Sequence, residues 1–195
     1  MHWSYYGSTF LFQIGLIYLI HHQIVKVYIM YRNILVPYDG SQPSNHALNH
    51  AVNLARIKST QKISVEVHLL YVVGEIHVPP SFGYGIKVYS SSRHEQSKTT
   101  VEYIKEIYHE LRSKALDMLN SKKKEYLKET NEIAIKTHVL LGHPADKIIE
   151  FANMQKIDLI VMGTVGLKGI SRIKAVGSVA RRVAEMASCP LLLVH

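Results

Sequence analysis

The sequence has a single cysteine, Cys189, among its 195 residues. One cysteine excludes an internal disulfide, and chains without disulfides are typical of a reducing compartment, so we predict a cytoplasmic protein. Cys189 stands directly before Pro190. We interpret it as a small apolar residue rather than as a nucleophile. The 47% hydrophobic and 19% charged residues are those of a globular domain.

The common motifs of phosphate- and metal-dependent enzymes are also missing. There is no GxxxxGK[ST] sequence, which excludes a P-loop NTPase, and no GxGxxG follows the first predicted strand. HExxH, Ser-His-Asp and nucleophile-elbow patterns are absent. His46 and His50 are one helical turn apart without a third ligand nearby, which favours a solvated helix face over a metal site. We therefore predict neither a catalytic residue nor a metal ligand.

Acidic residues are scarce relative to basic ones. The 15 Asp and Glu against 23 Lys and Arg give a net charge of +8. This charge suits an anionic partner, which is a nucleotide, a nucleic acid or a membrane surface. The basic residues are scattered and no aromatic-interleaved patch occurs, so the sequence gives no strong nucleic-acid signal.

Residues 1–29 form an apolar N-terminal extension, in which no Asp, Glu, Lys or Arg occurs between Trp3 and Val25. Its densest part, 9–20, falls short of the roughly 20 apolar residues of a membrane span. Three interpretations stay open: a weak membrane anchor, a segment packed on the domain, or a gene start placed too early. We favour the last, because Met30 opens MYRNILVPYDGS just ahead of a first strand. Membrane association is the alternative to a cytoplasmic location if the extension is real.

Residues 30–195 read as one α/β domain. Short apolar runs predict strands, and apolar residues at helical spacing predict helices. The predicted strands are 33–38, 63–73, 133–141, 158–163 and 190–195. One predicted helix begins at Pro43, another begins at Pro144, and a third spans residues 177–187. A long loop is predicted at 74–97, followed by a helix with the apolar stripe Ile104, Ile107, Leu111, Ala115, Met118 and Leu119. The alternation predicts an open five-stranded parallel sheet with helices on both faces.

Two loops at the carboxyl ends of predicted strands carry candidate ligand contacts. Gly163-Thr164-Val165-Gly166 follows the fourth strand, and Gly177-Ser178 opens the next helix, where backbone N–H groups attract phosphate. Ser178 either donates a further bond or caps the helix. Asp39 ends the first strand, where its carboxylate either accepts ribose hydroxyls or forms an Asx turn with Gly40 and Ser41.

These segments resemble the universal stress protein (UspA) family, with VMGTVG and CPLLLVH as the most specific parts. The resemblance covers residues 30–195 and implies a Rossmann-like fold of the adenine nucleotide alpha hydrolase type, with strand order 3-2-1-4-5. ATP-binding members carry G-x2-G-x9-G-[S/T], whereas the second gap here, LKGISRIKAV, has ten residues. Homodimers paired through the last strand, residues 190–194, are also implied. Leu192 and Val194 have the same orientation in that strand.

The resemblance implies ATP as the ligand, with a Mg or Mn ion possible beside the nucleotide. The implied contacts are Pro37 and Asp39 on the adenosine, Val72 at the adenine through its backbone, Met162, Gly163, Thr164 and Gly166 at the ribose and phosphates, and Gly177, Ser178 and Val179 at the phosphate tail.

The function expected is that of an ATP-binding stress-response module with at most slow hydrolysis. Two alternatives remain: an ATP-dependent hydrolase or transferase, and an interaction protein on a membrane or nucleic acid. Turnover in excess ATP separates the first alternative from a binding module, and salt-sensitive retention on DNA or liposomes supports the second.

Overall fold

The computed structural model describes residues 31–60, 63–75, 87–88, 98–128, 133–165 and 176–195. Strands and helices alternate through this part of the chain. The elements are β1 (Asn33–Pro37), α2 (Gln42–Thr60), β2 (Glu66–Val73), β3 (Lys87–Val88), β4 (Lys98–Thr99), α3 (Thr100–Leu127), β5 (Ala134–Leu141), α4 (Pro144–Met154), β6 (Leu159–Gly163), α5 (Ser178–Met186) and β7 (Leu191–Val194).

The main sheet has five strands in the order β5-β2-β1-β6-β7. All four neighbouring pairs are parallel. Numbered along the chain, the strands of this sheet follow the order 3-2-1-4-5, which confirms the expectation from the family resemblance. The predicted strand bounds were generous by one to three residues, since β2 begins at Glu66 rather than at Ile63.

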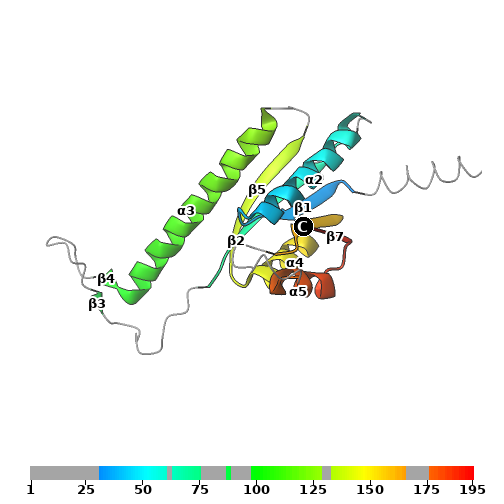
Figure 1. The fold of residues 1–195 in the computed structure, drawn as a ribbon. Coiled ribbons are helices and arrows are strands. Elements are labelled where there is room, and N and C mark those ends of the chain that lie inside the picture. Colours follow the sequence, from blue (N-terminus) through cyan, green and yellow to red (C-terminus); the bar gives the residue numbers. More distant parts are fainter. Residues whose placement is uncertain (1–30, 61–62, 76–86, 89–97, 129–132, 166–175) are drawn as a thin grey trace, which may run out of the picture.

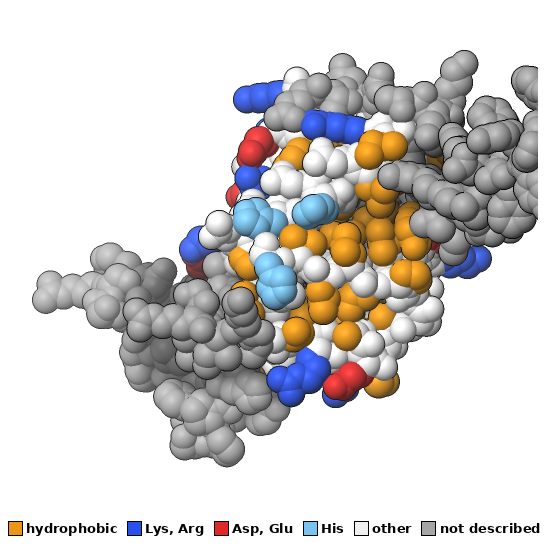
Figure 2. Space-filling view, turned by 45° about the vertical axis from the view of Figure 1, so that its right-hand side comes forward, with side chains coloured by type: hydrophobic (Ala, Val, Ile, Leu, Met, Phe, Trp, Pro, Cys, Tyr) orange, Lys and Arg blue, Asp and Glu red, His pale blue; other side chains and the backbone are white. Residues whose placement is uncertain are grey.

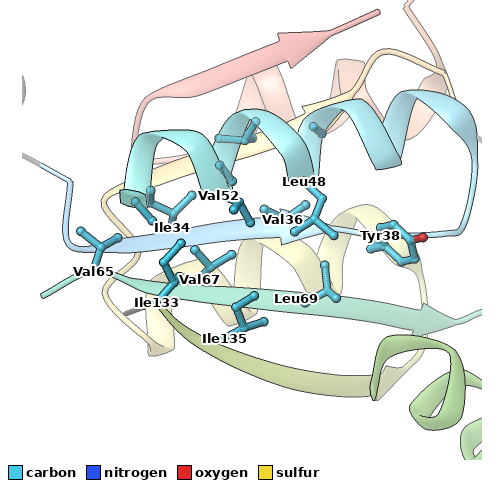
Figure 3. Packing of buried hydrophobic residues seen from close by; sticks show 14 of the residues in the cluster. Ile34, Val36, Tyr38, Leu48, Val52, Val65, Val67, Leu69, Ile133 and Ile135 are labelled. Carbon is cyan, nitrogen blue, oxygen red and sulfur yellow. The ribbon is translucent and has the colours of Figure 1, made fainter. Parts of the chain in front are cut away.

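Helices cover both faces of the sheet (Figure 1). On one face α2 and α3 pack over the strands, and Leu48 and Val52 of α2 point toward strand residues such as Ile34 and Val67 (Figure 3). On the other face α4 and α5 enclose a second core that includes Leu35, Ile160 and Val183. The inner strands are buried on both faces, which is why their sequences are continuously apolar rather than alternating. Each fully buried Leu, Ile or Val stabilises the fold by about 1.5–3 kcal/mol.

The predicted apolar stripe of α3 is only partly buried. Ala115 and Leu119 lie in the core, but Leu111 is 39% exposed. The reason is length: a helix of 28 residues spans about 42 Å, whereas a strand of 8 residues spans about 26 Å. The N-terminal half of α3 therefore extends past the sheet (Figure 1), which leaves Leu111 exposed although it belongs to the apolar stripe.

The region predicted as one long loop, 74–97, contains the short strand β3. Lys87 and Val88 pair antiparallel with Thr99 and Lys98 of β4, directly ahead of α3. Two-residue strands leave no detectable alternation in the sequence, so periodicity could not reveal them.

The apolar extension, residues 1–29, lies outside the described residues, and its three interpretations remain predictions. Within the residues that the structure does describe, no helix has both the length and the apolar character needed to cross a bilayer.

Candidate functional site

A cleft of about 510 Å³ opens at the carboxyl ends of β1, β2 and β6. From β1 the chain builds the sheet outward to β2 and β5 on one side, and then returns to add β6 and β7 on the other. The strand order therefore reverses at β1, where open α/β sheets bind their ligands. The first turns of α4 and α5 close the remaining sides of the cleft. Its volume falls within the range of small-molecule sites.

Nine of the ten residues predicted to contact a nucleotide line this one cleft. They are Pro37, Asp39, Val72, Met162, Gly163, Thr164, Gly177, Ser178 and Val179. The tenth, Gly166, lies outside the described residues. The fold thus brings together residues from three loops that are far apart in the sequence, and the contacts that each of them makes with a ligand remain predictions.

Asp39 forms the tight turn between β1 and α2. Its Oδ1 accepts a hydrogen bond from the Ser41 N–H at 3.0 Å, while Gly40 adopts a φ of 83°, which favours glycine. Ser41 in turn starts α2, since its carbonyl accepts the Asn45 N–H at 3.0 Å. The Asx turn expected from the sequence is therefore present. It does not exclude a contact of the same carboxylate with a ligand, because Asp39 also lines the cleft.

Val72 presents its backbone to the cleft. In a parallel sheet, successive residues direct their N–H and C=O groups alternately to the two neighbouring strands. Leu70 accepts the Tyr38 N–H, on the β1 side, and Val73 accepts the Gly142 N–H, on the β5 side. Val72 therefore directs its N–H and C=O toward the β1 side, past the point where β1 has ended. A donor and an acceptor held side by side match the edge of a nucleobase.

Gly163 ends β6 where the backbone of α2 approaches most closely. A Cβ at this position would lie 2.7 Å from Cβ of Pro43 and 2.9 Å from its carbonyl carbon. The sequence predicted that this glycine permits close approach of a ligand. In the structure it is the first turn of α2 that takes up this space. The glycine thus sets the position of the helix that follows Asp39.

The N-terminus of α5 opens into the cleft. Gly177 is the N-cap residue and makes no side-chain capping bond, and the first intrahelical bond runs from the Arg181 N–H to the Gly177 carbonyl. Three amides, those of Ser178, Val179 and Ala180, consequently have no partner within the helix, and all three residues line the cleft. Free N–H groups at a helix N-terminus, together with the helix dipole, generally attract anions. Since Gly177 is the cap residue, the alternative that Ser178 caps the helix was wrong.

Thr164 joins β6, β7 and α5 at the floor of the cleft. Its N–H donates to the Val194 carbonyl at 2.8 Å, and its carbonyl accepts the Gly177 N–H at 2.7 Å. The hydroxyl Oγ1 lies 3.1 Å from Nδ1 of His195. Only 3% of Thr164 is exposed. His195 was not singled out from the sequence, because a histidine at the end of a strand carries no pattern that points to a neighbour in space.

Tyr38, which the sequence analysis did not single out, also lines the cleft, while its side chain belongs to the core beneath α2. Its hydroxyl donates to Oδ1 of Asn45 at 2.9 Å. Burial, with a smaller contribution from the negative charge of Glu125, raises the pKa of the Tyr38 hydroxyl above its usual value. The side chain is therefore a neutral phenol at physiological pH. Among the described lining residues Asp39 is the only charged one. The segment between Gly166 and Gly177 carries Lys168, Arg172 and Lys174, which lie outside the described residues.

Within the described part of the chain, no three His, Cys, Asp or Glu side chains are arranged to hold a metal ion. His46 and His50 border a small surface cavity of about 130 Å³ together with Asn49 and Asn53. Nδ1 of His46 lies 2.9 Å from the carbonyl of His195. Cys189 is half-buried, and this burial raises the pKa of its thiol, which makes the thiolate harder to form.

Comparison with known proteins places these features in a family. A model described as the Universal stress protein family matches residues 30–195. Universal stress protein MJ0531 of Methanocaldococcus jannaschii is 38% identical over 165 residues, covering 85% of this chain and 82% of that protein. Universal stress protein YxiE of Bacillus subtilis is 30% identical over 166 residues, covering 85% of this chain and all (100%) of that protein.

Solved structures of universal stress proteins share the fold of this chain. Universal stress protein UspA from Lactobacillus plantarum superposes with a TM-score of 0.64 at 27% identity, covering 85% of this chain and 98% of its own. Two more distant structures share the fold and were solved with nucleotides. One is a universal stress protein in complex with cAMP (TM-score 0.53, 22% identity, covering 85% of this chain and 98% of its own). The other is the universal stress protein from Archaeoglobus fulgidus in complex with dAMP (TM-score 0.51, 21% identity, covering 85% of this chain and 99% of its own). With a family model that matches residues 30–195, this chain belongs to the universal stress protein family.

Proposed function

We propose that the chain is an ATP-binding universal stress protein of the cytoplasm, a regulatory nucleotide-binding module without a dedicated catalytic activity. One observation carries the proposal. The open amides at the N-terminus of α5 and the directed backbone groups of Val72 lie on the same cleft. The amides suit a phosphate chain, and the paired donor and acceptor suit an adenine.

We propose a place in the cleft for each part of the nucleotide. The adenine lies against the Val72 backbone, with Pro37 beside the nucleoside. The Asp39 carboxylate, at the end of the neighbouring strand β1, accepts the ribose hydroxyls. The phosphates accept hydrogen bonds from the amides of Ser178 and Val179. The other residues around the ribose and phosphates are Met162, Gly163, Thr164, Gly166 and Gly177. A Mg or Mn ion, where present, accompanies the phosphates rather than a protein ligand set.

The nucleotides named for two fold neighbours support a nucleotide as the ligand, since a chain of the same architecture binds cAMP in one and dAMP in the other. Catalysis is not expected to be efficient, because Asp39 is the only charged group among the described lining residues and already accepts a hydrogen bond in its turn. Any hydrolysis of ATP is therefore slow, and turnover measured in excess ATP tests this point against the alternative of a dedicated ATPase or transferase.

The phosphate site can be tested at a single backbone amide. Ser178 is the first residue of α5, and Gly177 before it has φ −61° and ψ 158°, a conformation that a following proline favours. Ser178→Pro therefore removes one amide donor while preserving the helix start. Ser178→Ala is the matched control, because it removes the hydroxyl and keeps the amide.

We expect Ser178→Pro to weaken ATP about tenfold or more in calorimetric titration, as for a hydrogen bond to a charged group, and to leave adenosine affinity unchanged. Ser178→Ala should retain most of the affinity. Nucleotide released from the purified parent by denaturation, and identified by chromatography, gives an independent measurement. A parent that binds no adenine nucleotide, or a proline variant that binds ATP as the parent does, contradicts the proposal.

We further propose that two copies of the chain pair through β7. This strand is an edge of the sheet, and its sequence from Leu191 to Val194 has no charge to discourage pairing with another strand. Leu192 is 43% exposed. Figure 2 shows hydrophobic side chains gathered on one face of the molecule, interspersed with polar atoms. Two-fold pairing of identical edges removes both edges at once.

Leu192→Lys should convert such a dimer largely to monomer, as measured by light scattering or sedimentation. Lys at Met186, which is 60% exposed at the end of α5, is the control for an added charge away from the strand. A parent that is monomeric at micromolar concentration excludes this assembly.

Residues 30–195 are proposed to contain the whole binding domain. A protein that begins at Met30 should then fold and bind ATP as tightly as the full chain. Cell-derived protein that retains residues 1–29 and partitions with membranes contradicts a start at Met30 and favours the anchor.

A further inference from the structure

The main chain of Thr164 is held in place by two hydrogen bonds. Its N–H donates a hydrogen bond to the carbonyl of Val194 in β7, and its carbonyl accepts one from the N–H of Gly177. A main chain fixed at both groups leaves the hydroxyl as the only polar group of this residue that can turn. The residue is 3% exposed and is among those that line the cleft, so its hydroxyl is a buried polar group close to the space that a ligand would fill.

The hydroxyl meets the imidazole of His195. Oγ1 of Thr164 and Nδ1 of His195 are 3.1 Å apart. The main chain of His195 is held as well, because its carbonyl lies 2.9 Å from Nδ1 of His46 on α2. His195 does not itself line the cleft. Its hydrogen bond with Thr164 connects it to the cleft.

We propose that His195 is a positioning residue of the nucleotide cleft: its Nδ1 donates to Thr164 Oγ1 and thereby directs the hydroxyl proton of Thr164 to a phosphate oxygen of the bound nucleotide. This inference rests on the proposed function, namely that the cleft binds a phosphorylated nucleotide.

The direction of the hydrogen bond decides what Thr164 offers. A threonine hydroxyl has one proton and two lone pairs. Where a neighbour takes the proton, the ligand meets lone pairs, which repel a phosphate. Where a neighbour donates to the oxygen, the proton remains for the ligand. A neutral imidazole with its proton on Nδ1 and an imidazolium both donate from this atom, so both forms turn Thr164 into a donor.

The position of Thr164 indicates which part of the nucleotide it contacts. Its carbonyl is bonded to Gly177, the cap residue of α5. Thr164 therefore lies beside the N-terminus of α5, whose amides would attract phosphate, whereas Val72 is on β2, which β1 separates from β6. A loss of this hydroxyl should weaken phosphorylated ligands and spare adenosine.

The test is a set of calorimetric titrations with ATP and with adenosine, on full chains that carry no added residues after His195. His195→Leu removes both ring nitrogens, and His195→Asn supplies an amide donor close to the position of Nδ1 on a smaller side chain. His46→Ala removes the contact to the His195 carbonyl and leaves the Thr164 contact in place. Thr164→Val removes the hydroxyl and preserves the shape of the side chain. Thermal unfolding of each variant reports whether the fold is retained.

We expect His195→Leu to weaken ATP about fivefold, His195→Asn to restore most of the affinity, and adenosine to bind all variants alike. His46→Ala should bind ATP as the parent does. Because both residues act through one hydrogen bond, adding His195→Leu to Thr164→Val should cause no further loss. The inference is overturned by any of three results. These are a His195→Leu variant that binds ATP like the parent, losses of ATP affinity that add in the double variant, or an equal loss of adenosine affinity. A parent that binds no ATP overturns the proposed function instead, which the first titration reveals.

Discussion

Gly163→Ala is expected to destabilise the domain by overpacking the junction of β6 and α2. The added methyl would lie 2.7 Å from Cβ of Pro43, 2.9 Å from its carbonyl carbon and 3.1 Å from the Ser44 nitrogen. Two of these atoms belong to the backbone and the third to a rigid ring, so no flexible side chain can move aside. Relief requires the whole N-terminal turn of α2 to shift.

The size of the effect follows from this rigidity. Extra methyl groups forced into well-packed interiors typically cost about 1–3 kcal/mol. For a domain of this size, each 1 kcal/mol lowers the melting temperature by about 2–4 °C. We therefore expect Gly163→Ala to melt about 3–10 °C below the parent in calorimetry or in thermal denaturation followed by circular dichroism, with a matching shift of the urea midpoint.

Gly74→Ala is the matched control, because a Cβ there meets no atom within 4 Å. It should leave stability unchanged or raise it by about 0.4–1 kcal/mol, through the lower entropy of the unfolded chain. The same displacement of α2 moves the Asp39 turn, so Gly163→Ala should also weaken ATP. If Gly163→Ala is as stable as Gly74→Ala, the contact with Pro43 does not explain the glycine.

Three further predictions follow from the described residues. Asp39→Asn keeps an oxygen for the Ser41 N–H and should cost little stability, while losing about 1.5–3 kcal/mol of ATP affinity if the charged carboxylate holds the ribose; equal affinity in calorimetry would leave Asp39 to the turn alone. Leu119→Ala should cost about 2–5 kcal/mol in urea unfolding, whereas Leu111→Ala, from the exposed half of α3, should cost less than about 1 kcal/mol. Burial lowers the pKa of both His68 and His138. Nδ1 of His68 lies 3.2 Å from Nε2 of His138, and the two rings lie beside Phe151 and near Glu66 and Lys136. As the pH falls, these histidines are protonated in the unfolded chain before they are protonated in the folded one. Their contribution to the free energy of unfolding is therefore fully present above about pH 6.5 and decreases below that pH. His68→Leu should flatten the pH profile of the melting temperature below about pH 6.5, and an unchanged profile would contradict this prediction.

Much of the fold was predictable because the sheet is parallel and covered on both faces. Its inner strands had to be continuously apolar, and the stretches around Ile34 and Ile160 are. The grouping of the site was predictable for a related reason. Carboxyl ends of parallel strands share one edge of the sheet, so residues such as Asp39 and Gly163 had to approach one another once the strand order was known.

The features that the sequence did not reveal depend on contacts between distant segments. Nothing in the pattern around Leu111 differs from that around Leu119, because helical periodicity records which residues share a face and not how far the opposing sheet extends. The role of Gly163 likewise depends on where Pro43 packs. The pairing of Thr164 with His195 joins residues 31 positions apart and required coordinates.

The last strand shows how such a contact alters an experiment. Its four apolar residues give no alternation, so the sequence indicated that Leu192 and Val194 share an orientation but not where either side chain lies. In the structure Val194 is 9% exposed and belongs to the core beneath α2, whereas Leu192 is 43% exposed. Lysine at Val194 would bury a charge and unfold the domain, and the loss of a dimer would then say nothing about the edge. Lysine at Leu192 alone changes the edge and spares the core, so it is the substitution that can separate assembly from folding.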